Sequence, residues 1–120
     1  MFLTDLDIHS HLQTPKMVVN PNSGRIIPKE GHFQINVALR SANGENYTLI
    51  ARQNDIIPED YSAILALEVS GGKTIILRRH NGSSHTHKNK IEEDLIEDVT
   101  HIHIATERYQ LQHNKIDGYA

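Results

Sequence analysis

The chain has 120 residues, no cysteine and a formal net charge of -3 at pH 7 with its 9 histidines counted as neutral. A chain of this length fits one domain, and without cysteine it has neither disulfides nor thiolate metal sites, so any metal would need His, Asp or Glu ligands. The acidic balance argues against a protein that coats nucleic acid through bulk charge.

Residues 1–31 are expected to form a helix and a loop. Thr4 can cap a helix over residues 5–12, whose first turn holds acidic side chains that the helix dipole favours. Pro15 ends this helix. Turn-forming residues between positions 20 and 31 then predict an irregular connection.

The sequence carries no sign of a membrane or export segment. Residues 1–5 lack a basic region and an apolar region of the kind that a secretion signal has. No apolar run approaches the ~20 residues that cross a bilayer as a helix. We therefore expect a cytoplasmic protein.

Residues 33–110 predict an antiparallel sheet. The clearest strand is 33–40, where apolar and polar residues alternate, and the Asn43-Gly44 turn returns the chain into a strand over 47–53. Further strands are expected at 61–69, 73–78 and 100–106. The fold prediction is a single α+β domain, residues 1–120, with an antiparallel meander of about five strands, a short N-terminal helix and no helix after the last strand.

Basic residues and histidines gather in one segment of this acidic chain, residues 77–90. The segment leaves a strand and enters a polar loop. Its basic and imidazole side chains are Arg78, Arg79, His80, His85, His87, Lys88 and Lys90. A local basic patch is therefore expected in spite of the negative net charge.

Two His-x-His pairs make this region chemically distinctive. Side chains two apart on an extended chain share a face, so His85 and His87 are expected to point the same way. The same parity puts His101 and His103 on one face of the last predicted strand, and the isoleucines between and after them on the other. The two pairs could therefore converge.

The leading hypothesis from these residues is a metal-independent ribonuclease. RNA supplies its own nucleophile, the 2′-hydroxyl, so a protein needs only an acid, a base and a cation, and no cofactor. The predicted catalytic residues are His85, His87, His103, Arg79 and Lys88, the last two as phosphate ligands. The predicted substrate-binding residues are Arg78, His101 and Tyr109, with Tyr109 stacking on a base or donating a hydrogen bond.

Two alternatives stay open, and both use other properties of the same residues. A metal-binding protein would use His85, His87, His101 and His103 as ligands, with zinc as one suitable ion. A non-catalytic interaction protein of phage or mobile-element type would bind a protein partner, or a second copy of itself, through a sheet edge and the basic loop.

The histidines also have a purely structural interpretation. His101 and His103 would then face water on the outer side of the last strand, while Ile102 and Ile104 fill the core. For Arg78 and Arg79 the corresponding role is to guard a sheet edge against aggregation.

The order of elements, with two hairpins leading into residues 77–82 and then Ser84-His85-Thr86-His87, resembles the small TumE-type toxins of bacterial toxin–antitoxin pairs and related uncharacterised families of mobile elements. The later run, His-Ile-His-Ile-Ala-Thr-Glu-Arg-Tyr-Gln over 101–110, is similar to a second signature of one such group. The resemblance covers roughly residues 33–120. It implies a toxin-like protein of bacterial or phage origin that acts on RNA, pairs with an antitoxin and uses His85, His87, His101 and His103.

Overall fold

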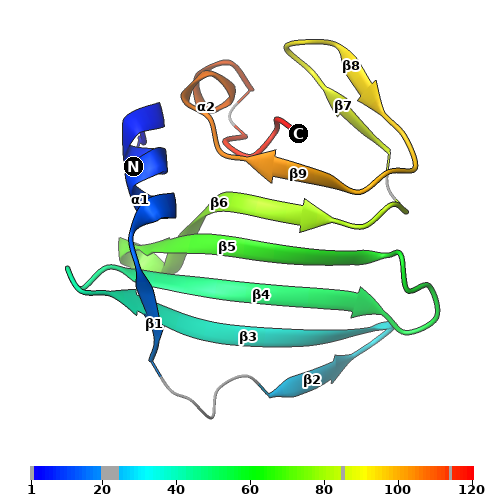
Figure 1. Cartoon of the computed structure of the whole chain (residues 1–120), viewed down its shortest axis with the longest axis horizontal. Coiled ribbons are helices and arrows are strands. Elements are labelled where there is room, and N and C mark those ends of the chain that lie inside the picture. Colours follow the sequence, from blue (N-terminus) through cyan, green and yellow to red (C-terminus); the bar gives the residue numbers. More distant parts are fainter. Residues whose placement is uncertain (1, 20–24, 85, 114) are drawn as a thin grey trace.

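An antiparallel sheet of seven strands is the centre of the structure, a computed structural model that describes residues 2–19, 25–84, 86–113 and 115–120. Its strands are β1 (Lys16–Val18), β2 (Ile26–Lys29), β3 (His32–Ser41), β4 (Asn46–Asn54), β5 (Tyr61–Val69), β6 (Lys73–Asn81) and β9 (His101–Ile104). They lie in the order β1-β3-β4-β5-β6-β9, and β2 pairs with β3 beside β1 (Figure 1). The meander of β3 to β6 is as the hairpin signals predicted.

The remaining elements are short. They are helix α1 (Asp5–Gln13), a 3-10 turn (Ser70–Gly72), the hairpin of β7 (His87–Asn89) with β8 (Asp94–Ile96), and helix α2 (Glu107–His113). Figure 1 shows the β7–β8 hairpin, α2 and the C-terminal segment together beyond the β9 edge of the sheet. No helix in the described part of the chain has the length and apolarity needed to cross a membrane.

Helix α1 confirms the N-terminal prediction. The Thr4 Oγ1 atom accepts the Asp7 N–H at 3.1 Å, and the Asp7 carboxylate accepts the Thr4 N–H at 3.0 Å. This reciprocal pair satisfies two N–H groups that a helix start leaves without intrahelical partners. The sequence therefore sets where the helix begins.

Two parts of the chain differ from the prediction. Residues 26–29 form a strand, although they lie in a segment predicted to be a loop, and Pro28 is accepted there because β2 lies at a sheet edge. The prediction of no helix after the last strand was wrong, since α2 follows β9. This helix is too short to be stable alone, and Tyr109, only 1% exposed, anchors it.

The sheet has two faces with different chemistry. The helix face carries Leu39, Tyr47 and Leu67, which are cross-strand neighbours, and it packs against Leu3 and Ile8 of the N-terminal region. The other face is defined by alternate residues of β5, by their partners on β6 and by the partners of those on β9. We call this the histidine face; its defining residues are Ser62, Ile64, Arg79, Asn81, His101 and His103.

An irregularity in β6 decides which of its residues reach the histidine face. Ala66 pairs with Ile76, but the preceding residue Leu65 pairs with Arg78, so β6 has one extra residue, Leu77, at this point. A β-bulge of this kind shifts the side-chain parity of all the following residues. As a result Arg79 and Asn81 lie on the histidine face, and Arg78 lies opposite Leu65 on the other.

Gly82, at the end of β6, gives a test of this packing. Its N–H donates to the Tyr61 carbonyl at 3.0 Å, and a Cβ atom at Gly82 would overlap the Glu59 carbonyl oxygen and lie 2.7 Å from the Tyr61 ring. We expect Gly82→Ala to lower the free energy of unfolding by about 2 kcal/mol, because backbone atoms cannot move aside cheaply. Urea denaturation with Ser83→Ala as the control measures this; equal midpoints for the two variants would contradict it.

Candidate functional site

Three imidazole rings from two separate parts of the chain lie together on the histidine face. The ring centroids of His87 and His103 are 4.4 Å apart, those of His101 and His103 are 5.1 Å apart, and those of His87 and His101 are 6.0 Å apart. His101 and His103 come from alternate positions of β9, and His87 opens β7. The expected convergence of the two regions is therefore present in these three residues.

The purely structural interpretation expected the isoleucines of β9 to be buried and its histidines to be exposed, and the structure shows the reverse. His101 and His103 are 7% and 2% exposed, whereas Ile102 and Ile104 are 39% and 37% exposed. A buried polar ring costs free energy unless it is hydrogen-bonded. The fold therefore needs partners for these imidazoles.

Backbone carbonyls supply those partners and select the form of each neutral ring. His101 Nδ1 lies 3.0 Å from the Val99 carbonyl, and His103 Nδ1 lies 2.8 Å from the Asp117 carbonyl. Since a carbonyl can only accept, both Nδ1 atoms carry hydrogen, and in the neutral ring Nε2 holds the lone pair. His87 is the opposite case, because its Nε2 lies 2.8 Å from the Gly118 carbonyl.

Burial keeps His103 in its neutral form. Loss of water around the ring, and after it the nearby Arg79 guanidinium, lower the pKa of His103 from its ordinary 6.5 to about 4. The ring is therefore a proton acceptor at neutral pH.

Cations and polar groups surround the three rings in a hollow of about 280 Å³. Its other lining residues are Arg52, Ser62, Arg79, Asn81 and Thr86. The Arg79 guanidinium lies 2.9 Å from the Asp117 carboxylate, and that carboxylate is only 6% exposed. Asn81 Nδ2 lies 3.4 Å from His101 Nε2, and Ser62 Oγ donates to Asn81 Oδ1 at 3.0 Å. We call the hollow that His87, His101 and His103 line the histidine pocket.

The C-terminal segment, residues 115–120, contacts two rings of the histidine pocket through its carbonyls. Asn89 binds Ala120 in both directions, through Asn89 Nδ2 to the Ala120 carbonyl at 2.7 Å and the Ala120 N–H to Asn89 Oδ1 at 2.8 Å. Gly118 packs so closely on the Tyr109 ring that a Cβ atom would lie 2.5 Å from Tyr109 Cδ2. The segment is thereby fixed where its carbonyls orient His87 and His103.

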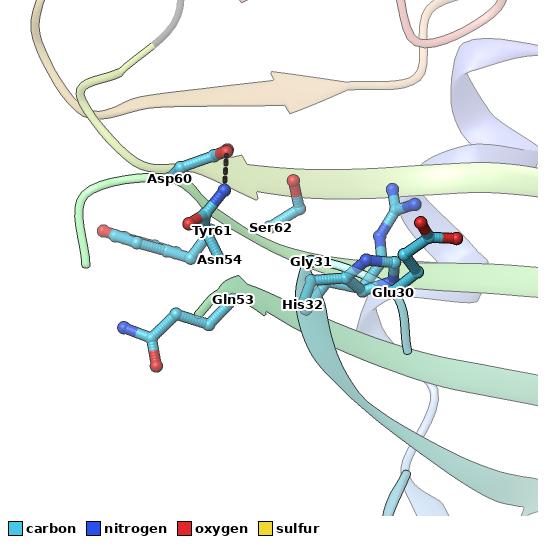
Figure 2. Close-up of a pocket in the computed structure, with 9 residues that line it drawn as sticks. Glu30, Gly31, His32, Gln53, Asn54, Asp60, Tyr61 and Ser62 are labelled. Atoms are coloured by element: carbon cyan, nitrogen blue, oxygen red, sulfur yellow. Dashed lines mark hydrogen bonds between the residues drawn. The ribbon is translucent and has the colours of Figure 1, made fainter. Parts of the chain in front are cut away.

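A polar row leads from the histidine pocket across the sheet. His101 pairs with Asn81, Asn81 with Ser62, and Ser62 with Arg52, a span of three strand steps or about 14 Å. Arg52 and Ser62 also line a second hollow of about 430 Å³, at the end of β4 and the starts of β3 and β5. Figure 2 shows this hollow, with the Asn54 amide joined to the Asp60 carboxylate at one side.

The structure brings together only part of the predicted set. His87, His101, His103 and Arg79 line one pocket, while His85 lies outside the described residues. Three predicted residues lie elsewhere: Lys88, Arg78 and Tyr109. Lys88 opens onto a different hollow, and Arg78, predicted to bind substrate, lies on the helix face because the β6 bulge turns it there.

The prediction that Tyr109 stacks on a base does not fit its place. The residue is 1% exposed, its hydroxyl donates to Glu92 at 3.1 Å, and the same oxygen accepts the Ile91 N–H at 3.0 Å. A ring covered in this way has no open face for a nucleobase. Tyr109 is instead a structural anchor for α2 and the C-terminal segment.

Five residues of the site were not anticipated from the sequence: Arg52, Ser62, Asn81, Thr86 and Asp117. The first three are ordinary polar residues of predicted strands or their ends, and only the cross-strand register assembles them. Asp117 lies in a segment with no regular structure. Asn81 and Thr86 lie within the basic segment 77–90, whereas nothing in the local sequence around Arg52, Ser62 and Asp117 signals a site.

Within residues 2–19, 25–84, 86–113 and 115–120, no three His, Asp or Glu side chains are arranged to hold a metal ion. Carbonyl-bound Nδ1–H groups such as those of His101 and His103 do occur in metal ligands, where they orient the ring. The fourth ligand of the zinc alternative, His85, is not among the described residues. Zinc binding therefore stays a prediction.

Comparison of the chain with protein-family models, with curated proteins and with solved structures gave no match. A function for the chain is therefore inferred from the residues of the site alone.

The lowered pKa of His103 predicts how stability changes with pH. The unfolded chain binds a proton at His103 near pH 6.5, and the folded protein only near 4. The unfolded state holds more protons in this window, so the free energy of unfolding falls as the pH falls through it, by at most about 3 kcal/mol. Urea denaturation at about pH 7 and about pH 5 measures the loss.

The control for this prediction exchanges one histidine at a time. His103→Gln should flatten the pH dependence, since glutamine keeps a donor for the Asp117 carbonyl but does not titrate. His9→Gln, at an exposed position of α1, should leave it unchanged. A His103→Gln protein with the same pH dependence as the unmodified chain would show that His103 is not the responsible group.

Asp117→Asn tests the ion pair behind the site. The exchange leaves the Arg79 charge, which is only 19% exposed at its side chain, without its carboxylate partner. We expect a loss of about 2 kcal/mol in the free energy of unfolding. The exposed Asp94→Asn exchange in β8 is the matched control, and thermal melts in which both variants behave alike would refute the expected role.

Proposed function

We propose that this protein is a metal-independent ribonuclease that acts from the histidine pocket. The observation that carries the proposal is the group of three oriented imidazoles, His87, His101 and His103, with centroids 4.4 to 6.0 Å apart beside Arg79. Acid, base and cation are the groups that phosphodiester transfer to a 2′-hydroxyl requires. The same pocket holds all three.

The charge of the pocket suits a phosphate. Arg52 and Arg79 both line it; the Asp117 carboxylate offsets part of the Arg79 charge while it holds the guanidinium in place, and Arg52 supplies a second cation. Arginine guanidinium groups are well suited to phosphate because they donate several hydrogen bonds in a plane. A bound phosphodiester would therefore be held against the rings by these two side chains.

In the proposed reaction His103 is the base and His87 the acid. The neutral His103 ring accepts the proton of the 2′-hydroxyl at Nε2 as the 2′-oxygen attacks phosphorus. His87, protonated at both nitrogens, gives the Nδ1 proton to the departing 5′-oxygen as the P–O5′ bond breaks. The products are a 2′,3′-cyclic phosphate and a 5′-hydroxyl, and His101 with Asn81 positions the substrate.

A toxin-like role is proposed from the sequence resemblance alone. Cleavage of cellular RNA would harm the cell that makes the enzyme, which would account for pairing with an antitoxin. A cytoplasmic location and a bacterial or phage origin belong to the same proposal. The histidine pocket supports the RNA chemistry and is compatible with each of these.

The alternative function is an interaction protein, and the helix face favours it. Ile26, Phe33 and Tyr61 are 61%, 46% and 36% exposed around a mainly apolar hollow of about 490 Å³. Large apolar patches on a soluble surface mark contact sites. A second copy of the chain is the proposed occupant, since equal apolar patches can meet about a twofold axis. Light scattering that gives a monomer for both the unmodified chain and Phe33→Ser would exclude this alternative.

The test of the ribonuclease proposal is cleavage of single-stranded RNA by purified protein with and without chelator. We expect cleavage that chelator does not affect, no cleavage of the 2′-deoxy analogue, and a cyclic phosphate product. His87→Gln and His103→Gln should each lower the rate by at least about 100-fold, and His9→Gln should not.

Failure of the proposal would be equally clear. No cleavage of RNA between about pH 5 and 8, by protein shown to be folded, would refute it. Cleavage that chelator abolishes and zinc restores would refute metal independence and favour the zinc alternative.

A further inference from the structure

Another hollow, which is basic and has a volume of about 260 Å³, is also lined by His87. Its cationic or imidazole side chains are Lys88, Lys90, Lys115, His113 and His87. They come from the β7–β8 hairpin, the end of α2 and the C-terminal segment, which Figure 1 shows close together. We call this hollow the basic pocket.

The basic pocket has a rigid floor. The His113 ring lies over Tyr109, with centroids 5.7 Å apart, and the Lys115 N–H donates to the Tyr109 carbonyl at 3.4 Å. Gly118 completes the floor, and its own N–H donates to the Lys115 carbonyl at 3.0 Å. The Lys115 backbone is therefore held in place, and Lys88 projects from β7, which pairs with β8.

The charge of the basic pocket has one sign. None of the residues that the structure places in its lining is acidic. Nearby, Glu92 is occupied by Arg108 at 2.9 Å and by the Tyr109 hydroxyl at 3.1 Å. Lysines that face one another without a carboxylate repel, so the pocket favours an anion.

We infer that the basic pocket is a phosphate subsite for the nucleotide next to the one that is cleaved. The inference rests on the proposed function, and it deepens it by naming the substrate as an RNA strand rather than a mononucleotide or a cyclic phosphate. His87 lines both pockets, so a strand with its scissile phosphate at the histidine pocket passes directly to the basic pocket. Lys88 thus keeps its predicted phosphate contact at a different phosphate.

The kinetic test compares three RNA substrates: a dinucleotide with a single phosphodiester, and the same dinucleotide with one added terminal phosphate at its 5′ end or at its 3′ end. We expect one of the added phosphates to lower KM about tenfold, since charged contacts of this kind contribute to substrate binding. The Lys90→Gln, Lys115→Gln double variant should lose that gain while kcat for the plain dinucleotide stays unchanged. Lys29→Gln, Lys73→Gln, exposed positions on β2 and β6, is the matched control.

Salt dependence gives a second readout on a longer strand. Loss of the one phosphate contact in the basic pocket should reduce the slope of log affinity against log salt concentration by about 0.7, because each neutralised phosphate of a single strand contributes about 0.7. Fluorescence anisotropy with a 2′-O-methyl RNA measures binding without cleavage. The control double variant should keep the original slope.

A binding measurement separates this inference from the ribonuclease proposal. Inorganic pyrophosphate titrated into the protein should shift the NMR signals of His113 and Lys115, and the Lys90→Gln, Lys115→Gln protein should bind it at least tenfold more weakly. Binding of this pattern without any RNA cleavage would support phosphate binding in the basic pocket but refute the ribonuclease, and with it the subsite's part in cleavage. Equal binding by both proteins, or an equal KM gain from the added phosphate, would overturn the subsite while cleavage stands.

Discussion

The extra residue in β6 is the constraint on which the site depends. Because Leu77 is inserted between the partners of Leu65 and Ala66, every later residue of β6 changes face. Arg79 and Asn81 therefore stand beside His103 and His101 in the cross-strand pairs. A regular β6 would turn Arg78 and His80 toward the imidazoles instead. The contacts of Asn81 with His101 and of Arg79 with Asp117 would then not form.

Burial of imidazoles on a sheet face is unfavourable by itself, and the structure offsets it with backbone carbonyls. His101, His103 and His87 each place one ring N–H on a carbonyl, two of them in the C-terminal segment. The segment is in turn held by Asn89 and by close contact of Gly118 with Tyr109. The packing of the chain itself thus orients the three rings.

The electrostatic result is a neutral proton acceptor inside a cationic surface. The pKa of His103 is lowered to about 4 by burial first and Arg79 second, while arginines and lysines collect on both sides of His87. This combination suits an anionic substrate that must lose a proton. An acidic chain can thus carry local positive charge, since negative charges near these pockets are paired, as in Asp117 and Glu92.

The sequence by itself determined the α+β class, the capped helix at Thr4 and the four long strands, because these depend on local periodicity, turns and caps. It also determined that His101 and His103 share a face. Only the tertiary structure decided which face is buried, which arginine joins it and which lysines lie apart, because strand register, the bulge at Leu77 and the path of the last residues arise from contacts between distant segments. Helix α2 belongs with these, since a helix of its length forms only where Tyr109 can be buried.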